Sequence, residues 1–360
     1  MSSSKLSDQL SFQEVDAILI SSAFQIAYLT GYSNFSHQER EAFVLLTPQA
    51  NYIFTDARYS EAVSQIPRFS LMEISGQVTF TDHLKKIIDK YSLKSLGIEG
   101  DHLTVSELRR LEKVISEIKE IKLDALRAEK KVTEIQKIEQ ACQIGDQVFK
   151  ASLKKIKMGM TEKKLSLEME LLMRKKGVVP SFDTIVAFGA HSSVPHHQTG
   201  NTTLKGQGEV VLLDFGTKYE KYCSDMTRTF FLGKASVKQK KIYQTVLAAQ
   251  TKAADFLDQQ IKKDVLVTGK EVDQVAREYI ISQGYPSIPH SLGHGIGLQV
   301  HEYPRLSPRS DDVLVEGMVF SIEPGIYIPG FGGVRIEDLY VIEKTGLRQL
   351  THASKELIEL

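Results

Sequence analysis

Residues 210–232 read VVLLDFGTKYEKYCSDMTRTFFL and decide how the second half of the chain folds. Two apolar, strand-like runs flank the polar tip at residues 218–221, and this pattern predicts a β-hairpin. Asp214 ends the first run and Asp225 lies in the second. A two-residue turn at residues 219–220 would place these two carboxylates directly opposite each other on one face of the ladder.

A second pair of strand-like runs repeats this arrangement. MVFSIEPGIYI (318–328) carries Glu323, and GGVRIEDLYVI (332–342) carries Glu337. A hairpin centred near Gly330 sets these two residues opposite each other. Like charges opposed on a half-buried sheet face are destabilising, and a bound cation is the simplest compensation.

The segment SLGHGIGLQVHE (291–302) supplies a candidate nitrogen ligand. His294 lies between Gly293 and Gly295, and we expect these glycines to let the backbone approach a ligand closely. Four carboxylates and one neutral imidazole carry four negative charges, which match two divalent cations. This oxygen-rich donor set favours Mn²⁺, with Co²⁺, Zn²⁺ or Fe²⁺ as alternatives. Bridging carboxylates hold two such ions about 3.5–4 Å apart.

Taken singly, each of these residues has an ordinary structural explanation. An aspartate at a strand end is commonly a turn or cap residue, and a histidine among glycines is commonly structural. Glu337 and Asp338 also fit an exposed strand end. The ordered coincidence of all five candidates favours a metal site.

Composition argues against several classes of function. The 360 residues include 45 Lys and Arg against 45 Asp and Glu, so the formal net charge is zero. This balance gives no electrostatic reason to expect nucleic acid or an anionic membrane as a partner. The N-terminus lacks the apolar run of a signal peptide, and we find no run long enough for a membrane span. Cys142 and Cys223 are too few for a disulfide framework, which favours a reducing, cytoplasmic setting.

The order of patterns predicts an α/β (α+β) protein with two domains, residues 1–125 and 126–360. Residues 15–63 contain short strands with a hairpin connection at 47–51. Later patterns predict a strand at 95–100 and helices at 81–91, 106–121, 127–158, 161–176, 237–257 and 270–283.

These segments resemble the pita-bread metallopeptidases, specifically the Xaa-Pro branch that comprises aminopeptidase P and prolidase. The matching stretches are LLDFG, SDMTRTF, HSLGHGIGLQVHE, EPGIY, VRIEDL and IVAFGAHSSVPHHQTG. YLTGYS and YIFTDARYSEAV resemble the family's N-terminal domain, so the resemblance covers essentially the whole chain. It implies a creatinase-like α/β domain, followed by a pita-bread catalytic domain in which helices flank an antiparallel sheet.

The resemblance also implies roles for individual residues. The family's metal ligands fall on the residues already singled out: Asp214, Asp225, His294, Glu323 and Glu337. Glu323 is also the implied proton shuttle, while His301 and His196 would stabilise the tetrahedral intermediate and position the peptide. His290 is a further implied substrate-binding residue. Arg335 would brace the carboxylates from behind.

The implied activity is hydrolysis of the Xaa-Pro bond at the N-terminus of proline-containing peptides by a metal-bridged hydroxide. Xaa-Pro dipeptidase (prolidase) is the alternative. Methionine aminopeptidase is disfavoured because a large N-terminal domain precedes the catalytic half. A peptide-binding domain without activity and creatinase, a non-metal hydrolase, are disfavoured because all five ligands are present. A homodimer is implied by the resemblance alone.

The chain departs from the family at two places. The family commonly has Asn at the position of His191, and a second loop histidine follows His196 at position 197. Residues 33–40 (SNFSHQER) lack the small, glycine-rich character common there. The first departure bears on substrate positioning, and the second on any contribution of the N-terminal domain to the site.

Overall fold

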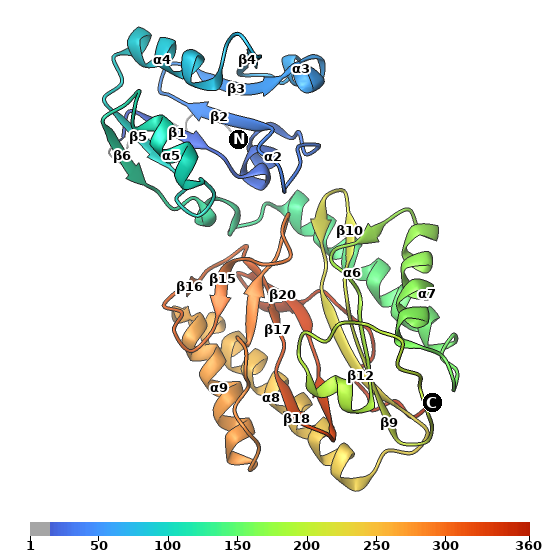
Figure 1. Ribbon diagram of the computed structural model, residues 1–360. Coiled ribbons are helices and arrows are strands. Elements are labelled where there is room, and N and C mark those ends of the chain that lie inside the picture. The colour runs from blue at the N-terminus through green and yellow to red at the C-terminus, as the bar shows by residue number, and fades with distance from the viewer. Residues whose placement is uncertain (1–14) are drawn as a thin grey trace. The chain divides into compact units, whose positions relative to one another are not determined.

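The computed structural model describes residues 15–360, and the chain divides into two compact units, Met1–Leu123 and Asp124–Leu360. The expected boundary between residues 125 and 126 lies within the 3₁₀ turn η1 (Asp124–Arg127). Both units combine helices and sheets (Figure 1). The α/β (α+β) fold class expected from the sequence is confirmed.

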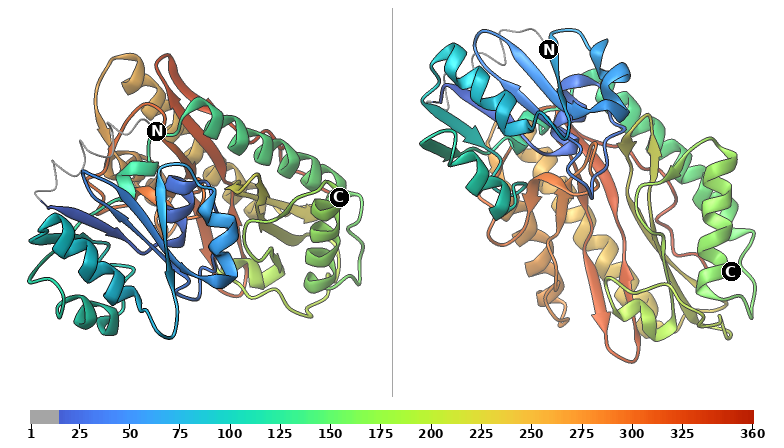
Figure 2. Two further views of the ribbon diagram at one scale, coloured as in Figure 1. Left: turned by 90° about the horizontal axis from the view of Figure 1, so that it is seen from above. Right: turned by 45° about the horizontal axis from the view of Figure 1, so that its top comes forward.

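Unit 1 is a six-stranded mixed sheet with the strand order β4-β3-β2-β1-β5-β6. Its strands are β1 (Ala17–Ile20), β2 (Ala42–Leu46), β3 (Asn51–Asp56), β4 (Phe69–Ile74), β5 (Ser95–Ile98) and β6 (Glu117–Glu120). Its helices are α2 (Ala23–Thr30), α3 (Ala57–Ser64), α4 (Phe80–Tyr91) and α5 (Val105–Leu111). Leu84 and Ile87 of α4 pack against β-strand residues such as Phe54 and Leu96, which places this helix on one face of the sheet (Figure 2). The predicted hairpin connection at 47–51 is confirmed by the pairing of β2 with β3.

The helix predicted over residues 106–121 is only half right. The helix α5 ends at Leu111, and residues 117–120 form the edge strand β6 in parallel register with β5. Ser95 pairs with Glu117 and Ile98 with Glu120. Hydrogen bonding to a sheet edge therefore overrides the helical spacing of this segment, a tertiary effect that local periodicity does not contain.

Unit 2 contains two pairs of helices. The first pair is α6 (Val132–Leu153) with α7 (Glu162–Lys175), and the second is α8 (Val237–Lys262) with α9 (Gly269–Ser282). All four were predicted, with ends that differ by a few residues. Figure 1 shows α6 and α7 beside β9 and β12, and α8 and α9 beside the strands near the C-terminus.

The strands of unit 2 form several small antiparallel sheets. The first group is β7 (Val179–Pro180), β8 (Ile185–Phe188), β9 (Glu209–Phe215), β10 (Thr217–Tyr219), β11 (Tyr222–Cys223) and β12 (Met226–Leu232). The second group is β13 (Val267–Thr268), β14 (Gly293–Gly295), β15 (Glu302–Leu306), β16 (Val313–Leu314), β17 (Val319–Ile322), β18 (Gly325–Ile328), β19 (Gly332–Arg335), β20 (Asp338–Glu343) and β21 (Gly346–Gln349). A short 3₁₀ turn, η2 (Gly189–Ser193), follows β8.

The register predicted for the first hairpin is wrong by two residues. Asp214 lies opposite Thr227 rather than opposite Asp225. The turn residues are Glu220 and Lys221, with φ of 42° and 78°, one position later than expected. Positive φ at both positions is the geometry of a type I′ turn, which matches the twist of a hairpin. Moving the turn by one residue moves every cross-strand partner by two.

The register of the second hairpin is confirmed by the ladders on both sides of it. Ile322 pairs with Asp338, and Gly325 pairs with Arg335. Both pairings are symmetric about residue 330, so the same register sets Glu323 opposite Glu337 along the chain. The backbone register of this hairpin is therefore the one that the sequence indicated.

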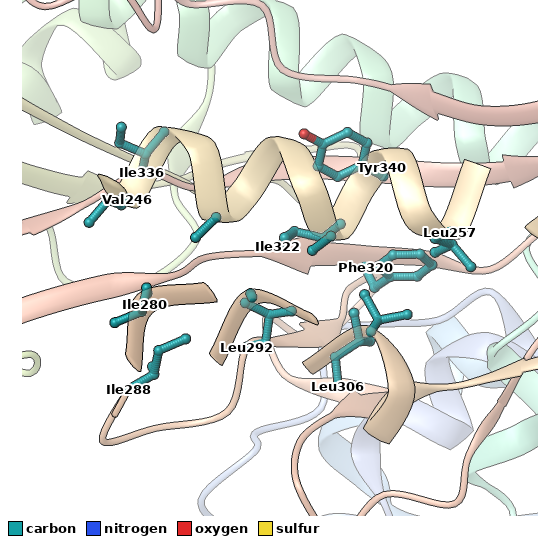
Figure 3. Packing of buried hydrophobic residues seen from close by; sticks show 14 of the residues in the cluster. Val246, Leu257, Ile280, Ile288, Leu292, Leu306, Phe320, Ile322, Ile336 and Tyr340 are labelled. Carbon is teal, nitrogen blue, oxygen red and sulfur yellow. The ribbon is translucent and has the colours of Figure 1, made fainter. Parts of the chain in front are cut away.

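Strand alternation decides which side chains face the helices and which face away from them. Phe320 and Ile322 of β17 join a buried apolar cluster with Val246 and Leu257 of α8 (Figure 3). Because side chains alternate along a strand, Ser321 and Glu323 point to the other side. The core under α8 therefore fixes the direction in which Glu323 points.

The same rule acts in the first half of unit 2. Val211, Leu213 and Phe215 of β9 belong to the cluster that contains Leu165 and Met169 of α7. Asp214 consequently points away from α7.

Within the described residues, no helix combines the length and apolar character needed to cross a lipid bilayer.

Candidate metal centre and substrate cavity

The five candidate metal ligands meet at one cavity in unit 2. This cavity has a volume of about 460 Å³. Its wall includes Asp214, Asp225, His294, Glu323 and Glu337, the full set singled out in the sequence. The structure therefore brings together all five, including Asp225, although Asp225 does not face Asp214 across the ladder.

His294 presents one ring nitrogen to the carboxylates. Its Nδ1 lies 3.1 Å from the carbonyl oxygen of Gly295, to which it can only donate. Nε2 then carries the lone pair, 3.4 Å from Oε1 of Glu323 and 3.7 Å from Oδ2 of Asp225. Burial lowers the pKa of His294 to about 3, so the ring is neutral. A neutral imidazole oriented by its second nitrogen is the form that binds a metal.

The carboxylates are crowded and poorly satisfied by the protein. Oδ1 of Asp214, Oδ1 of Asp225 and Oε1 of Glu337 are buried without a hydrogen-bond partner among the described residues. Burial, and then the charges of neighbouring carboxylates, raise the pKa of Asp225 and of Glu323 well above the usual range. The same causes raise the pKa of Glu337 to about 8.

These observations fit divalent cations. A buried carboxylate oxygen without a hydrogen-bond donor has lost its water and gained nothing in return, and a bound cation removes this cost. Within the described residues, no donor reaches the three carboxylate oxygens named above. Donor atoms of Asp225, His294 and Glu337 lie within 4.8 Å of one another. The donor set of four carboxylates and one imidazole is of the type that binds first-row divalent metals.

Arg335 connects the carboxylates of the two hairpins. Its Nη2 lies 2.6 Å from Oδ2 of Asp214, and its Nε donates to Oγ1 of Thr227 at 2.9 Å. Thr227 in turn donates to Oε2 of Glu337 at 2.7 Å. Arg335 thus contacts Asp214 directly and Glu337 through Thr227, and the part of Thr227 was not predicted.

A buried network behind Glu337 was also missed. Arg228 is 1% exposed, donates to the backbone carbonyl of Glu337 and contacts Oδ1 of Asp338 at 2.6 Å. Gln250 of α8 donates to Oδ2 of the same aspartate at 3.1 Å. Glu337 and Asp338 are 2% and 0% exposed, so the exposed strand end considered as an alternative is wrong. The adjacent acidic pair was the only signal in the sequence.

His290 lies on the cavity wall at the end of an oriented chain of hydrogen bonds. Its Nδ1 lies 2.7 Å from the carbonyl oxygen of Ser291, and its Nε2 lies 2.8 Å from the hydroxyl of Tyr327. Arg335 donates to the same hydroxyl at 3.0 Å, so Tyr327 donates to His290. Burial lowers the pKa of His290 to about 4. Tyr327 lay within the matched EPGIY stretch, but no role was predicted for it.

His196 and His301 also line the cavity, as expected. The ring of His301 meets that of His294 edge-on, with 4.2 Å between centroids. Burial lowers the pKa of His301, and the charge of Asp214 opposes this shift. Both histidines therefore share the cavity wall with the candidate ligands.

The expectation for the glycines around His294 needs correction. A Cβ on Gly293 would lie 1.9 Å from the carbonyl oxygen of Ser321, and one on Gly295 would lie 2.2 Å from that of Tyr303. These glycines admit the backbones of neighbouring strands rather than a ligand. Their effect on the site is indirect, because the tight packing of β14 fixes the backbone of His294.

A cavity that gathers uncompensated carboxylates around one neutral imidazole is typical of metal-dependent hydrolases. Comparison with known proteins agrees with this class. The sequence model of metallopeptidase family M24 matches residues 136–344, and that of the creatinase/prolidase N-terminal domain matches residues 3–129. The chain belongs to metallopeptidase family M24.

Individual relatives cover nearly the whole chain. The Xaa-Pro dipeptidase of Pyrococcus horikoshii is 36% identical over an alignment of 367 positions, which covers 98% of this chain and 97% of the relative. The solved Xaa-Pro dipeptidase of Bacillus anthracis is 36% identical with a TM-score of 0.91, covering 99% of this chain and 98% of the other. The solved X-Pro aminopeptidase of Thermotoga maritima is 35% identical with a TM-score of 0.84, covering 98% and 99%.

Proposed function

We propose that this protein is a dinuclear metallopeptidase that hydrolyses Xaa-Pro bonds. The proposed ligands are Asp214, Asp225, His294, Glu323 and Glu337. The observation that carries the proposal is the set of buried carboxylate oxygens without donors in one cavity with a neutral imidazole. The names of the relatives above support Xaa-Pro substrates.

When bound, a pair of divalent ions supplies activation of a water molecule near neutral pH and polarisation of the scissile carbonyl. Glu323 accepts the proton of this water and delivers it to the leaving proline nitrogen. His196 and His301 hydrogen-bond the substrate and the developing oxyanion from the cavity wall. Arg335 and Thr227 hold the carboxylates in place throughout.

The Xaa-Pro substrate could be a dipeptide or a longer peptide, and we favour the dipeptide. Arg305 lines the cavity, and its guanidinium has no carboxylate or hydrogen-bond partner within residues 15–360. Its charge lies close enough to His301 to lower the pKa of that residue, although burial is the larger cause. An unpaired guanidinium suits a carboxylate of the substrate. In an Xaa-Pro dipeptide, that carboxylate belongs to the residue directly after the scissile bond.

A comparison of three substrates tests this proposal. We expect the Mn²⁺-loaded protein to hydrolyse Ala-Pro faster than Ala-Pro amide or Ala-Pro-Ala. The variant R305Q should raise KM for Ala-Pro by about 10- to 100-fold, because a charge-assisted hydrogen bond is lost, with little effect on Ala-Pro-Ala. R309Q, a change of an exposed arginine outside the cavity wall, is the control.

Each outcome of this assay has a separate meaning. No hydrolysis of any of the three peptides with Mn²⁺, Co²⁺ or Zn²⁺ would contradict the peptidase proposal itself. Preference for Ala-Pro-Ala would instead support the Xaa-Pro aminopeptidase activity that the sequence placed first, which the Thermotoga maritima relative also suggests.

The donor set supports a particular metal, and the two cysteines support a particular cellular compartment. Mn²⁺ suits a carboxylate-rich site with one imidazole, and metal analysis of the purified protein tests this choice. Both cysteines are free and buried, which fits a reducing cytoplasm. We also propose a homodimer, to be tested by sedimentation.

A further inference from the structure

A second group of metal-ligating side chains lies in unit 2, apart from the substrate cavity. Glu162 in the first turn of α7, His191 in η2 and His197 in the following loop place one donor atom each within 4.8 Å of one another. None of the three lines the cavity, to which this loop contributes Pro195 and His196. We propose that these three side chains bind one Zn²⁺ ion at a site separate from the dinuclear centre.

The donor atoms already lie near ligand spacing. Nδ1 of His191 is 2.9 Å from Oε1 of Glu162, and Nε2 of His197 is 3.0 Å from Oε2. Tetrahedral zinc with bonds of about 2.0–2.1 Å separates neighbouring ligand atoms by about 3.3 Å. The two rings are 4.3 Å apart between centroids. A small outward movement of the imidazoles therefore opens room for the ion.

The side chain of Glu162 is held in one orientation by the backbone around it. Its side chain is fully buried, and the backbone N–H groups of Phe188 and Gly200 donate to it at 2.9 and 3.1 Å. Such outer hydrogen bonds orient metal ligands in known sites.

The site is also open on one side. The side chain of His191 is 41% exposed and that of His197 is 13% exposed, against 0% for Glu162. An ion can therefore enter from solvent and keep a water as its fourth ligand. Two imidazoles with one carboxylate form a familiar zinc donor set, and imidazole favours Zn²⁺ over Mg²⁺ or Ca²⁺.

This site gives a role to His191 and His197, the two histidines by which the chain departs from the family pattern. It also connects to the substrate cavity through the loop. Arg335 donates to the carbonyl oxygen of Pro195 at 3.2 Å, and Gly333 donates to Ser192 at 2.8 Å. An ion between α7 and this loop ties down the segment that carries His196.

Zinc titration of the metal-free protein tests the proposal by calorimetry, without an activity readout. We expect the wild type to bind one more equivalent of Zn²⁺ than the double variant H191N/H197N. H352N, a change of an exposed histidine elsewhere in unit 2, should bind like the wild type. The single variant H191N should weaken the extra site by about tenfold or more. Equal stoichiometry and affinity in all four proteins would overturn the proposal.

The result does not depend on the dinuclear centre. If that centre failed to bind zinc, the wild type would still bind one equivalent and the double variant none. Anomalous diffraction from a zinc-soaked wild-type crystal gives a second test that requires no variant to fold. A peak between Glu162, His191 and His197 is expected, and density without a peak there would reject the site.

Discussion

Nη2 of Arg335 lies 2.6 Å from Oδ2 of Asp214, and Nε of the same guanidinium donates to Thr227, which in turn donates to Glu337. Arg335 is 3% exposed, so its charge acts on the carboxylates with little screening by water. Through Thr227 it also fixes the orientation of Glu337. One buried arginine thus orients two candidate ligands that come from different hairpins.

Replacing this arginine should loosen the metal centre. We expect R335Q to lower the affinity for Mn²⁺ by about 10- to 100-fold, because the residues that orient metal ligands are lost. R335K keeps the charge without the planar fork and should fall between R335Q and the wild type. Calorimetric titration of the metal-free proteins measures this. R348Q removes an arginine that pairs with Glu139 and Glu343 at the surface, and an R335Q affinity equal to that of R348Q would contradict the prediction.

The metal-free protein should lose stability as the pH rises from 6.5 to 8. Burial raises the pKa of Glu337 from its usual value of 4.5 to about 8, so the native state retains a proton that the unfolded chain releases. Stability therefore falls across that window. His294 and His290 act in the opposite sense, because burial lowers their pKa from 6.5 to about 3 and about 4. Their contribution rises only up to pH 6.5.

Urea unfolding of the EDTA-treated protein at pH 6.5 and 8.0 measures this balance. We expect a lower midpoint at pH 8.0. Added Mn²⁺ should reverse the order, because the metal binds the ionised carboxylates and its affinity grows with pH. A metal-free midpoint that is equal or higher at pH 8.0 would show that the carboxylates are ionised without cost in the native state.

The sequence identified which residues meet at the cavity, but it predicted only part of their geometry. The second hairpin was placed correctly because it has a clear centre at Gly330. The first was not, because Glu220 and Lys221 adopt positive φ without a glycine to signal the turn. Turn type is set by the twist of the flanking strands, which the residue types of this tip do not reveal.

The supporting hydrogen bonds were the least predictable part of the site. The roles of Thr227 and Tyr327 depend on the hydrogen-bond partners that their hydroxyl groups meet in the folded protein, and the sequence alone does not reveal these partners. Thr and Tyr are common residue types in strands, so their presence gives no signal of a special role. The helices, in contrast, could be predicted from apolar spacing and from capping residues such as Thr161 before α7. Thr161 does cap this helix in the structure.

Tyr327 should position His290 without taking part in the chemistry. In Y327F, Nε2 of His290 and Nη1 of Arg335 lose a shared partner in a half-buried place. An unsatisfied buried polar group costs about 1–3 kcal/mol, so we expect a loss of stability of this size. We also expect KM for Ala-Pro to rise more than kcat falls. Y340F changes a buried tyrosine whose hydroxyl has no hydrogen-bond partner within the described residues, and it should leave KM unchanged. Equal KM values for the two variants would remove Tyr327 from the substrate site.

Glu323 and Glu337 should fail in different ways when each is replaced by glutamine. The side chain of Glu323 is 16% exposed, whereas Glu337 is 2% exposed as a residue and accepts a hydrogen bond from Thr227. Glu323 is therefore the better placed to exchange a proton with a substrate in the cavity. We expect E323Q to lower kcat by about 10²- to 10⁴-fold, the usual contribution of a general acid–base group.

The response to metal separates these two roles. A glutamine oxygen can still contact a metal but cannot carry the proton, so excess Mn²⁺ should not restore E323Q. E337Q loses a charged ligand, and its activity should recover partly as Mn²⁺ is raised. Steady-state kinetics on Ala-Pro over a range of Mn²⁺ concentrations measures both effects. Recovery of E323Q by excess metal would assign Glu323 a ligand role alone. The proton would then have to pass through another group on the cavity wall, and His301, whose ring lies edge-on to that of His294, is the alternative to test.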